Sequence, residues 1–472
     1  MAAGTLDIDA LREGATPSRA SMARTVLALS APAILAELST TLMQYIDAAM
    51  VGSLGAHATA SIGIVESTIW LLDGLAMSAA MGFTVQVAQL VGAGRDEEAR
   101  NVLRQAIVVL VAFGAILAAV GMGVSGSLPR WLGAAPELYD DSARYVRVCS
   151  LALLPLALAR LGTGMLQCSG DMRTPSMLNV LSCLFDVGFN AMLIRDGWDI
   201  TLAGVSVHLP AAGLGVVGAA LGTLLAQTVT ACLLMWCTLA RSERLALRER
   251  GTWMPQLRTL RPAWSMSWPM FVERVVTSAA YVACTAIVAP LGVVAVAANS
   301  LAITAEAVCY MPGVGIEAAA TTLVGQTLGA RRKDMARSFA RLSTVLGMLV
   351  MSASGLVMFV LAPQIMAMLT PDAAVQELGV RVLRIEAFAE PLFAASMVAA
   401  GALRGAGDTL IPSIISLASM WGVRITLMRV VAPRWGLTGV WRVMAFELCV
   451  RGALFLWRLL HDKWLDRAVP VG

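Results

Sequence analysis

The chain has 472 residues, of which 58% are hydrophobic and only 14% are charged, with a mean hydropathy of +0.74 and a formal net charge of +4. A soluble domain has roughly 45–50% apolar and about 25% charged residues. The composition therefore excludes a cytosolic enzyme, a nucleic-acid binder and a disordered chain, and it indicates an integral membrane protein.

Apolar stretches long enough to cross a bilayer as helices, about 20 residues each, follow one another along the chain. Residues 1–20 are polar and acidic and lack the apolar core of a cleavable signal peptide. Twelve spans are predicted, at about 24–53, 57–90, 102–126, 143–167, 174–195, 213–240, 263–290, 294–327, 339–362, 378–403, 411–432 and 436–459.

The loops between these spans differ in charge. Most of their basic residues fall in the loops on one side, together with both tails. The positive-inside rule then places both termini in the cytoplasm, in agreement with an even number of spans. Arginine far outnumbers lysine, which suggests a GC-rich bacterial gene. We therefore expect a multi-pass protein of the bacterial cytoplasmic (inner) membrane.

The chain repeats itself at a constant offset of 237 residues from about residue 32 to residue 182, so that Pro32 pairs with Pro269 and Gln89 with Gln326. Each repeat holds six spans and enters the membrane in the same direction. This predicts an all-α membrane protein of twelve helices, in two six-helix lobes related by a pseudo-two-fold axis along the membrane normal. Such repeats are typical of transporters. The predicted parts are a cytoplasmic tail (1–23), an N-lobe (24–240), a cytoplasmic linker (241–262), a C-lobe (263–460) and a second cytoplasmic tail (461–472).

Ionisable residues inside a membrane are costly, and each is a functional candidate. Acids outnumber bases within the predicted spans, which favours a path for cations or protons over one for anions. The acids are Glu37, Asp47, Glu66, Asp73, Asp186, Glu273, Glu306, Glu317, Glu386, Glu390 and Glu447, and the bases are Arg160, Arg274, Arg424 and Arg451.

One group of polar residues is predicted to meet in the half of the N-lobe farther from the cytoplasm. Asp186 and Asn190 are four residues apart and share a helix face, and Asp47 and Thr223 lie at similar depths on other spans. Two carboxylates, an amide oxygen and a hydroxyl suit a shared proton or, as metal ligands, Na⁺. The alternative is a structural hydrogen-bond cluster that fixes these helices.

The C-lobe offers Glu273 and Glu306 as further candidates that line the cleft or contact the substrate. For Glu273, a role in cation or substrate binding and a buried ion pair are equally open. Glu386, Glu390 and Arg424 are predicted to form a structural ion-pair set, with lining of the cleft as the alternative. The eight cysteines show no metal or disulfide spacing and are expected to be buried and reduced. The chain has only three histidines, which nearly excludes a catalytic or metal site built on histidine.

Several segments resemble the multidrug and toxic compound extrusion (MATE) family. They are PAILAELSTTLMQYIDAAMVGSLG at residues 32–55, AEAVCYMPGVGIEAAATTLVGQTLGA at 305–330, GALRGAGDTLIPS at 401–413 and GLTGVW at 436–441. The resemblance covers nearly the whole chain after about residue 25. It implies efflux of large, often cationic and amphipathic molecules in exchange for Na⁺ or H⁺, by alternation between outward-open and inward-open lobes.

The resemblance also bears on individual residues. Asp47 matches the ion-binding aspartate of the archaeal and DinF-like branches, Thr223 matches their threonine, and Asp186 and Asn190 give their Asn-x-x-x-Asp pair in reversed order. Glu273 lies about one turn nearer the start of its span than the glutamate of the NorM branch, and Phe393 stands where that branch has an aspartate. The closer likeness is thus to the archaeal and DinF-like side.

The interpretation is an antiporter and not an enzyme, with no cofactor besides the coupling ion, H⁺ or Na⁺. Small-molecule drugs or toxic metabolites are the expected substrates, contacting Met43, Gln44, Tyr45 and the acids of the cleft. The lipid bilayer is the other partner, nucleic acid is not one, and the protein is expected to be a monomer. The main alternative is a flippase for a lipid-linked saccharide or peptidoglycan precursor, although such a cleft would be rich in arginine. A membrane-embedded enzyme and a receptor or structural membrane protein fit the histidine positions and the repeat less well.

Overall fold

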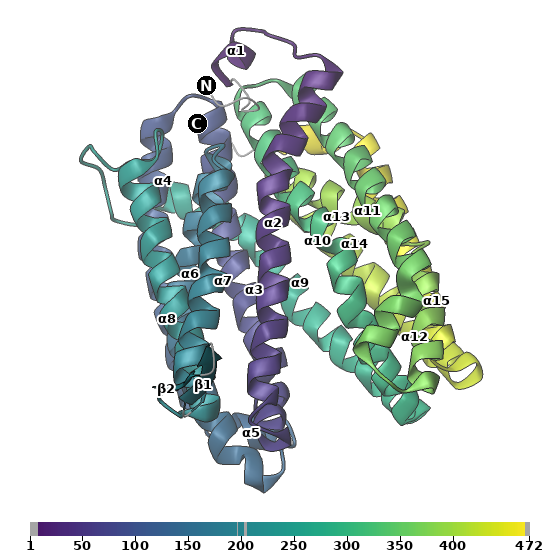
Figure 1. Ribbon diagram of the computed structural model, residues 1–472. Coiled ribbons are helices and arrows are strands. Elements are labelled where there is room, and N and C mark those ends of the chain that lie inside the picture. The colour runs from purple at the N-terminus through teal and green to yellow at the C-terminus, as the bar shows by residue number, and fades with distance from the viewer. Residues whose placement is uncertain (1–7, 196, 203–204, 468–472) are drawn as a thin grey trace.

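The computed structural model describes residues 8–195, 197–202 and 205–467. Its helices form two bundles (Figure 1). The first bundle holds α2 (Arg19–Gly52), α3 (Ala56–Gly92), α4 (Asp96–Val124), α6 (Tyr139–Cys168), α7 (Arg173–Leu193) and α8 (Gly215–Trp236). Short elements accompany them: α1 (Ile8–Arg12), α5 (Leu128–Trp131), the 3₁₀ turn η1 (Pro136–Leu138) and the π-helical turn η2 (Cys237–Arg241).

The second bundle repeats this order. It holds α9 (Leu257–Val288), α10 (Val293–Gly329), α11 (Lys333–Leu369), α12 (Ala373–Glu386), α13 (Glu390–Gly405), α14 (Leu410–Ala418) and α15 (Thr426–Leu460). The π-helical segment η4 (Ser419–Ile425) joins α14 to α15 without a break, and the 3₁₀ turns η3 (Ala289–Leu291) and η5 (Lys463–Asp466) complete the bundle. The all-α fold class predicted from the sequence is confirmed.

Within the described residues, nine helices are long and apolar enough to cross a membrane. The other three predicted spans fall on broken or charged helices. One is split between α12 and α13, and one runs through α14, η4 and the start of α15. The last begins at Gly436, whose non-helical backbone (φ 57°, ψ −150°) kinks α15. A count of twelve crossings therefore fits the elements and remains a prediction.

The two lobes contact each other through repeat-related helices. Helix α2 packs against α10, and α9, its counterpart in the second repeat, packs against α3. Both ends of the chain lie at the same end of the bundles, here called the terminal end, and α2 and α9 run apart toward the opposite end (Figure 1). The described parts of the two tails fold onto the terminal end: Leu11 is 2% exposed and Trp464 is fully buried. Residues 1–7 and 468–472 of the predicted tails lie outside the described residues.

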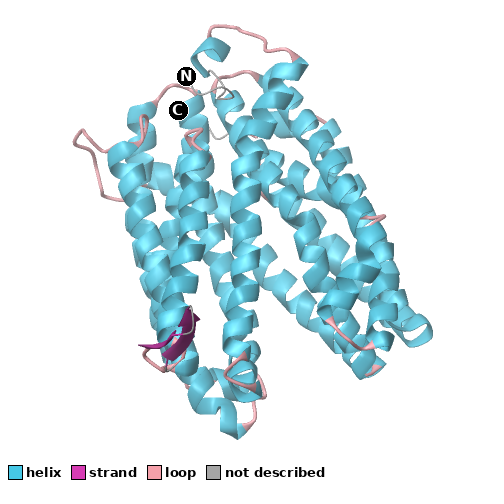
Figure 2. Cartoon of the chain, in the orientation of Figure 1, coloured by secondary structure: helices cyan, strands magenta, loops and turns pink. Residues whose placement is uncertain are grey.

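Among the described residues, β-strands occur only in one small hairpin (Figure 2). Strands β1 (Gly197–Leu202) and β2 (Val205–Pro210) pair antiparallel between α7 and α8. The second repeat has no counterpart of this hairpin, because α14, η4 and α15 follow one another there without an intervening loop. All eight cysteines are free, but the expectation that they are buried holds only for Cys168, Cys237 and Cys309. Cys232 is exposed, and the other four are half-buried.

Candidate functional site

Four predicted residues come together in the first lobe, near the end opposite the termini. The Asn190 amide nitrogen Nδ2 donates to Asp47 Oδ1 at 2.9 Å and to Asp186 Oδ2 at 3.0 Å. The Asp47 and Asp186 side chains also contact each other, and the Thr223 hydroxyl donates to Asp186. Asp186 is 2% exposed and Asn190 is 1% exposed. The cluster thus ties α2, α7 and α8 together, with Asp186 and Asn190 buried and with Asp47 and Thr223 half-buried.

Local sequence explains why these helices present the four side chains to one another. Asp186 and Asn190 lie one turn apart on α7 and share a face. That face is enclosed because α7 packs against both α2 and α8. Small residues on α8 allow the close approach, since a Cβ atom at Gly222 would lie only 2.0 Å from Asn190 Oδ1.

The cluster has the chemistry of a small-cation site. Two adjacent carboxylates in a buried environment cannot both be charged without a large cost, which a shared proton or a bound cation removes. Asn190 Oδ1 is buried and has no hydrogen-bond partner among the described residues, so it is available as a ligand. In the described part of the chain no three His, Cys, Asp or Glu side chains are grouped to hold a metal ion. A Na⁺ ion here would therefore depend on the amide and hydroxyl oxygens.

Substitution of Gly222 by alanine tests whether this packing matters. The added methyl group must displace the Asn190 amide, and we expect a loss of about 1–3 kcal/mol in the free energy of unfolding. Gly188→Ala on α7 is the matched control, because a Cβ atom there meets nothing within 4 Å. Thermal unfolding of both variants in detergent checks this. Equal melting temperatures would show that α8 does not constrain Asn190.

The residues predicted to contact the substrate lie on α2. Gln44 and Tyr45 are exposed, and Met43 is half-buried. The Tyr45 hydroxyl donates to the Thr304 carbonyl oxygen of α10 at 2.9 Å, which links the two lobes. Their role in substrate binding stays a prediction.

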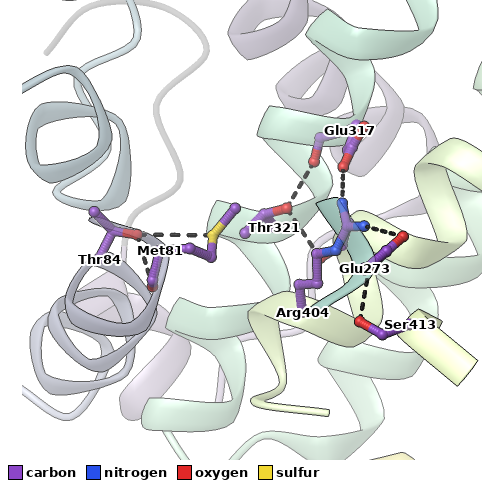
Figure 3. A network of polar contacts seen from close by, with 8 residues as sticks. Met81, Thr84, Glu273, Glu317, Thr321, Arg404 and Ser413 are labelled. Atoms are coloured by element: carbon purple, nitrogen blue, oxygen red, sulfur yellow. Dashed lines mark hydrogen bonds and ion pairs between the residues drawn. The ribbon is translucent and has the colours of Figure 1, made fainter. Parts of the chain in front are cut away.

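Glu273 in the second lobe is held by partners on neighbouring helices (Figure 3). Its carboxylate accepts a hydrogen bond from Ser413 Oγ at 2.7 Å and lies 3.7 Å from the Arg404 guanidinium. Arg404 also donates to Glu317 at 2.8 Å. Glu273 is thus part of a half-buried ion pair, and its role in cation or substrate binding stays a prediction.

The predicted ion-pair set of Glu386, Glu390 and Arg424 is wrong. Arg424 instead contacts Glu447 at 2.6 Å, and Glu447 also accepts a hydrogen bond from Ser419 and lies 3.3 Å from Arg451. The reason is the π-helical segment η4, which contains Arg424 and turns it toward α15. Glu386 and Glu390 are fully buried. The carboxylate oxygens of Glu386 have no hydrogen-bond partner among the described residues, and Glu390 contacts the Cys309 thiol.

Glu306 lies in the same interior of the second lobe. Its side chain on α10 is 9% exposed and within electrostatic reach of Arg424 and Glu386. It does not meet the Asp47 cluster, and its predicted role stays untested.

A cavity of about 150 Å³ lies between the lobes. Acidic residues reach it from both sides: Glu37 on α2 of the first lobe and Glu317 on α10 of the second. Arg160, also in its lining, is paired with Asp73 at 2.9 Å. The sequence assigned no individual role to Glu37 or Glu317. Its one signal for them was that both are acids within predicted spans.

Comparisons with known proteins agree with the internal repeat. The MatE family model matches residues 32–192 and again residues 269–429. A probable multidrug resistance protein NorM from Thermotoga maritima is 25% identical over 446 residues, covering 94% of this chain and 93% of that protein. Multidrug resistance protein PmpM from Pseudomonas aeruginosa is 28% identical over 402 residues, covering 84% and 81%.

A solved structure shows the same fold. It is a MOP superfamily transporter from Pyrococcus furiosus, described by a reverse polarity of its binding pocket that suggests a different function. It superimposes with a TM-score of 0.87 at 19% identity, covering 98% of this chain and 99% of that one. The two family matches lie in the register of the 237-residue repeat and cover more than half of the chain. The chain therefore belongs to the MatE family.

Proposed function

We propose that this protein is a secondary active multidrug efflux transporter, which exchanges an amphipathic, often cationic compound for H⁺ or Na⁺ by alternating access. The family membership and the multidrug resistance names of the relatives from T. maritima and P. aeruginosa support efflux. The same relatives support a transporter over an enzyme.

The single observation that carries the coupling is the Asn190 amide, which holds two carboxylates from different helices together. When Asp47 and Asp186 are both negatively charged they repel each other, which favours separation of α2 from α7. Uptake of a proton or Na⁺ favours their contact. Binding of the ion therefore differs in energy between two helix arrangements, as ion coupling requires. Thr223 and Asn190 would complete the coordination of Na⁺ if Na⁺ is the ion.

The substrate proposal rests on charge. The interlobe cavity is lined by Glu37, Glu317 and Arg160, of which Arg160 pairs with Asp73 and Glu317 pairs with Arg404. Glu37 is therefore the lining acid that has no ion-pair partner among the described residues. An amphipathic cation gains from such a lining, whereas an anion does not. Substrate would also contact Met43, Gln44 and Tyr45 on its way to the open end of the lobes.

The transport cycle follows from these two sites. In the state open at the end opposite the termini, the ion binds the Asp47 cluster, α2 repacks and the substrate leaves. The loaded protein then opens at the terminal end, releases the ion and binds the next substrate. We also propose that the chain crosses the membrane twelve times with both termini in the cytoplasm. The protein would be a monomer in the bacterial inner membrane. Within the family we place it closer to the archaeal and DinF-like branches.

The alternative is a flippase of a related superfamily for a lipid-linked saccharide or peptidoglycan precursor. A pyrophosphate would need unpaired arginines in the cleft. Arg404 and Arg160 instead have acidic partners, which favours the export of cations. The P. furiosus neighbour shows that the fold alone does not decide this question.

Transport of an ethidium-type dye in proteoliposomes tests the proposal. An outward dye flux driven by an imposed pH or Na⁺ gradient, each applied alone, is expected for the unmodified protein. The flux should be lost in Asp47→Asn, which cannot bind the ion. No dye movement under either gradient would favour the flippase, and a normal gradient-driven flux in Asp47→Asn would remove Asp47 from the coupling site.

A further inference from the structure

Two glutamines join the lobes at the terminal end in a reciprocal way. Gln89 Nε2 on α3 donates to the Gly405 carbonyl oxygen at the end of α13, at 3.1 Å. Gln326 Nε2 on α10 donates to the Cys168 carbonyl oxygen at the end of α6, at 2.9 Å. Both donors and both acceptors are equivalent positions of the 237-residue repeat. Each lobe thus supplies one glutamine and receives the other.

The helices that carry these glutamines cross in backbone contact. A Cβ atom at Gly92 would lie 2.0 Å from the Gln326 carbonyl oxygen, and a Cβ atom at Gly329 would lie 1.9 Å from the Gln89 carbonyl oxygen. These glycines are again equivalent positions of the repeat. Gln89 and Gln326 are 1% and 2% exposed. The crossing therefore brings the two helices into backbone contact at the terminal end, with both glutamines buried.

The acceptors explain why glutamine is placed here. The last carbonyl groups of a helix have no partner within that helix. When the lobes are in contact, the carbonyls of Cys168 and Gly405 are dry and depend on the glutamines. When the lobes part, water takes over this role. A hydrogen bond that exchanges with water contributes only modestly, so it can hold a gate without locking it.

We propose that Gln89 and Gln326 form a two-part latch that keeps the terminal-end gate closed and sets the balance between the two openings of the transporter. The proposal rests on the alternating access of the proposed function. Gly92 and Gly329 are part of the latch, because only glycine permits the crossing. The glutamines act on the gate and not on the ion or the substrate.

A native thiol at the crossing reports whether the gate is open. Cys168 is 4% exposed, lines the interlobe cavity and lies between the hydroxyls of Thr84 and Thr322 from the two lobes. Its modification by a charged maleimide in nanodiscs, followed by mass spectrometry of the peptide, measures how often the crossing parts. Slow modification is expected for the unmodified protein.

Loss of one latch bond should raise that rate roughly three- to tenfold. Gln89→Ala is the informative variant, because it removes the bond to the Gly405 carbonyl and leaves the bond from Gln326 to the Cys168 carbonyl in place. Gln326→Ala should give a rise of similar size, and Gly92→Ala should exceed both. Gln105→Ala is the control, because this equally buried glutamine accepts a hydrogen bond from the Gln256 backbone away from the crossing.

A rate in Gln89→Ala no higher than in Gln105→Ala would overturn the latch. So would a rise confined to Gln326→Ala, which would show local exposure of Cys168 and not opening of the gate. A melting temperature within a few degrees of the unmodified protein shows that each variant is folded. The labelling needs neither dye nor gradient, so the latch can be upheld even if the proposed substrate or coupling ion is wrong.

Discussion

Replacement of Asp186 by asparagine should reduce gradient-driven efflux by on the order of 100-fold, the upper range of typical coupling between two sites. The variant keeps the size of the side chain and an oxygen that can accept from Asn190, so α2, α7 and α8 should stay packed. It removes the negative charge that makes ion uptake depend on the helix arrangement. The measurement is the initial rate of dye efflux from proteoliposomes with and without the driving gradient.

A second variant separates charge from position. Asp186→Asn combined with Asn190→Asp restores two acids to the cluster in exchanged places on the same face of α7. We expect the double variant to recover part of the gradient-driven efflux. Unchanged efflux in Asp186→Asn alone would mean that the cluster only fixes helices. Failure of the double variant with a normal melting temperature would mean that the Asp-x-x-x-Asn order is itself required.

The largest loss of stability is expected from Glu447→Gln. Glu447 is fully buried and is the acidic partner of Arg424 and Arg451, so its neutralisation leaves two guanidinium groups in the interior without the carboxylate that contacts them. Removal of one partner from a buried ion pair costs about 3–5 kcal/mol. Thermal and denaturant unfolding in detergent micelles measure this loss.

Glu377→Gln provides the matched control. Glu377 also pairs with an arginine, Arg381, but both side chains are exposed. Exposed pairs contribute about 0–1 kcal/mol, so this variant should unfold close to the unmodified protein. If the two variants were equally stable, the second lobe would not depend on the contact between η4 and α15.

The sequence by itself was enough for the fold class and for much of the first-lobe cluster. Long apolar stretches have few alternatives in a bilayer, because only helices satisfy their own backbone there. The two family matches, at residues 32–192 and 269–429, confirm the repeat that was read from positions such as Pro32 and Pro269. Asp186 and Asn190 could be placed on one face because helical periodicity is local.

The sequence predicted contacts between helices only where the depth of a residue in the membrane, or its equivalent position in the repeat, limited the possible partners. Asp47 and Thr223 were matched to α7 by their distance from the membrane surface, and the structure does bring them together. The reciprocal bonds of Gln89 and Gln326 went unforeseen, although the repeat had already paired these residues. A repeat shows which positions are equivalent, but the crossing of the lobes determines what they contact.

Only the tertiary structure decided the partners of the buried charges in the second lobe. The sequence analysis grouped Arg424 with Glu386 and Glu390, but the π-helical segment that contains Arg424 brings it to Glu447. Glu273 likewise acquired its partners, Arg404 and Ser413, from two other helices. Local sequence determines the face on which a side chain lies, whereas its partner depends on packing between segments far apart in the chain.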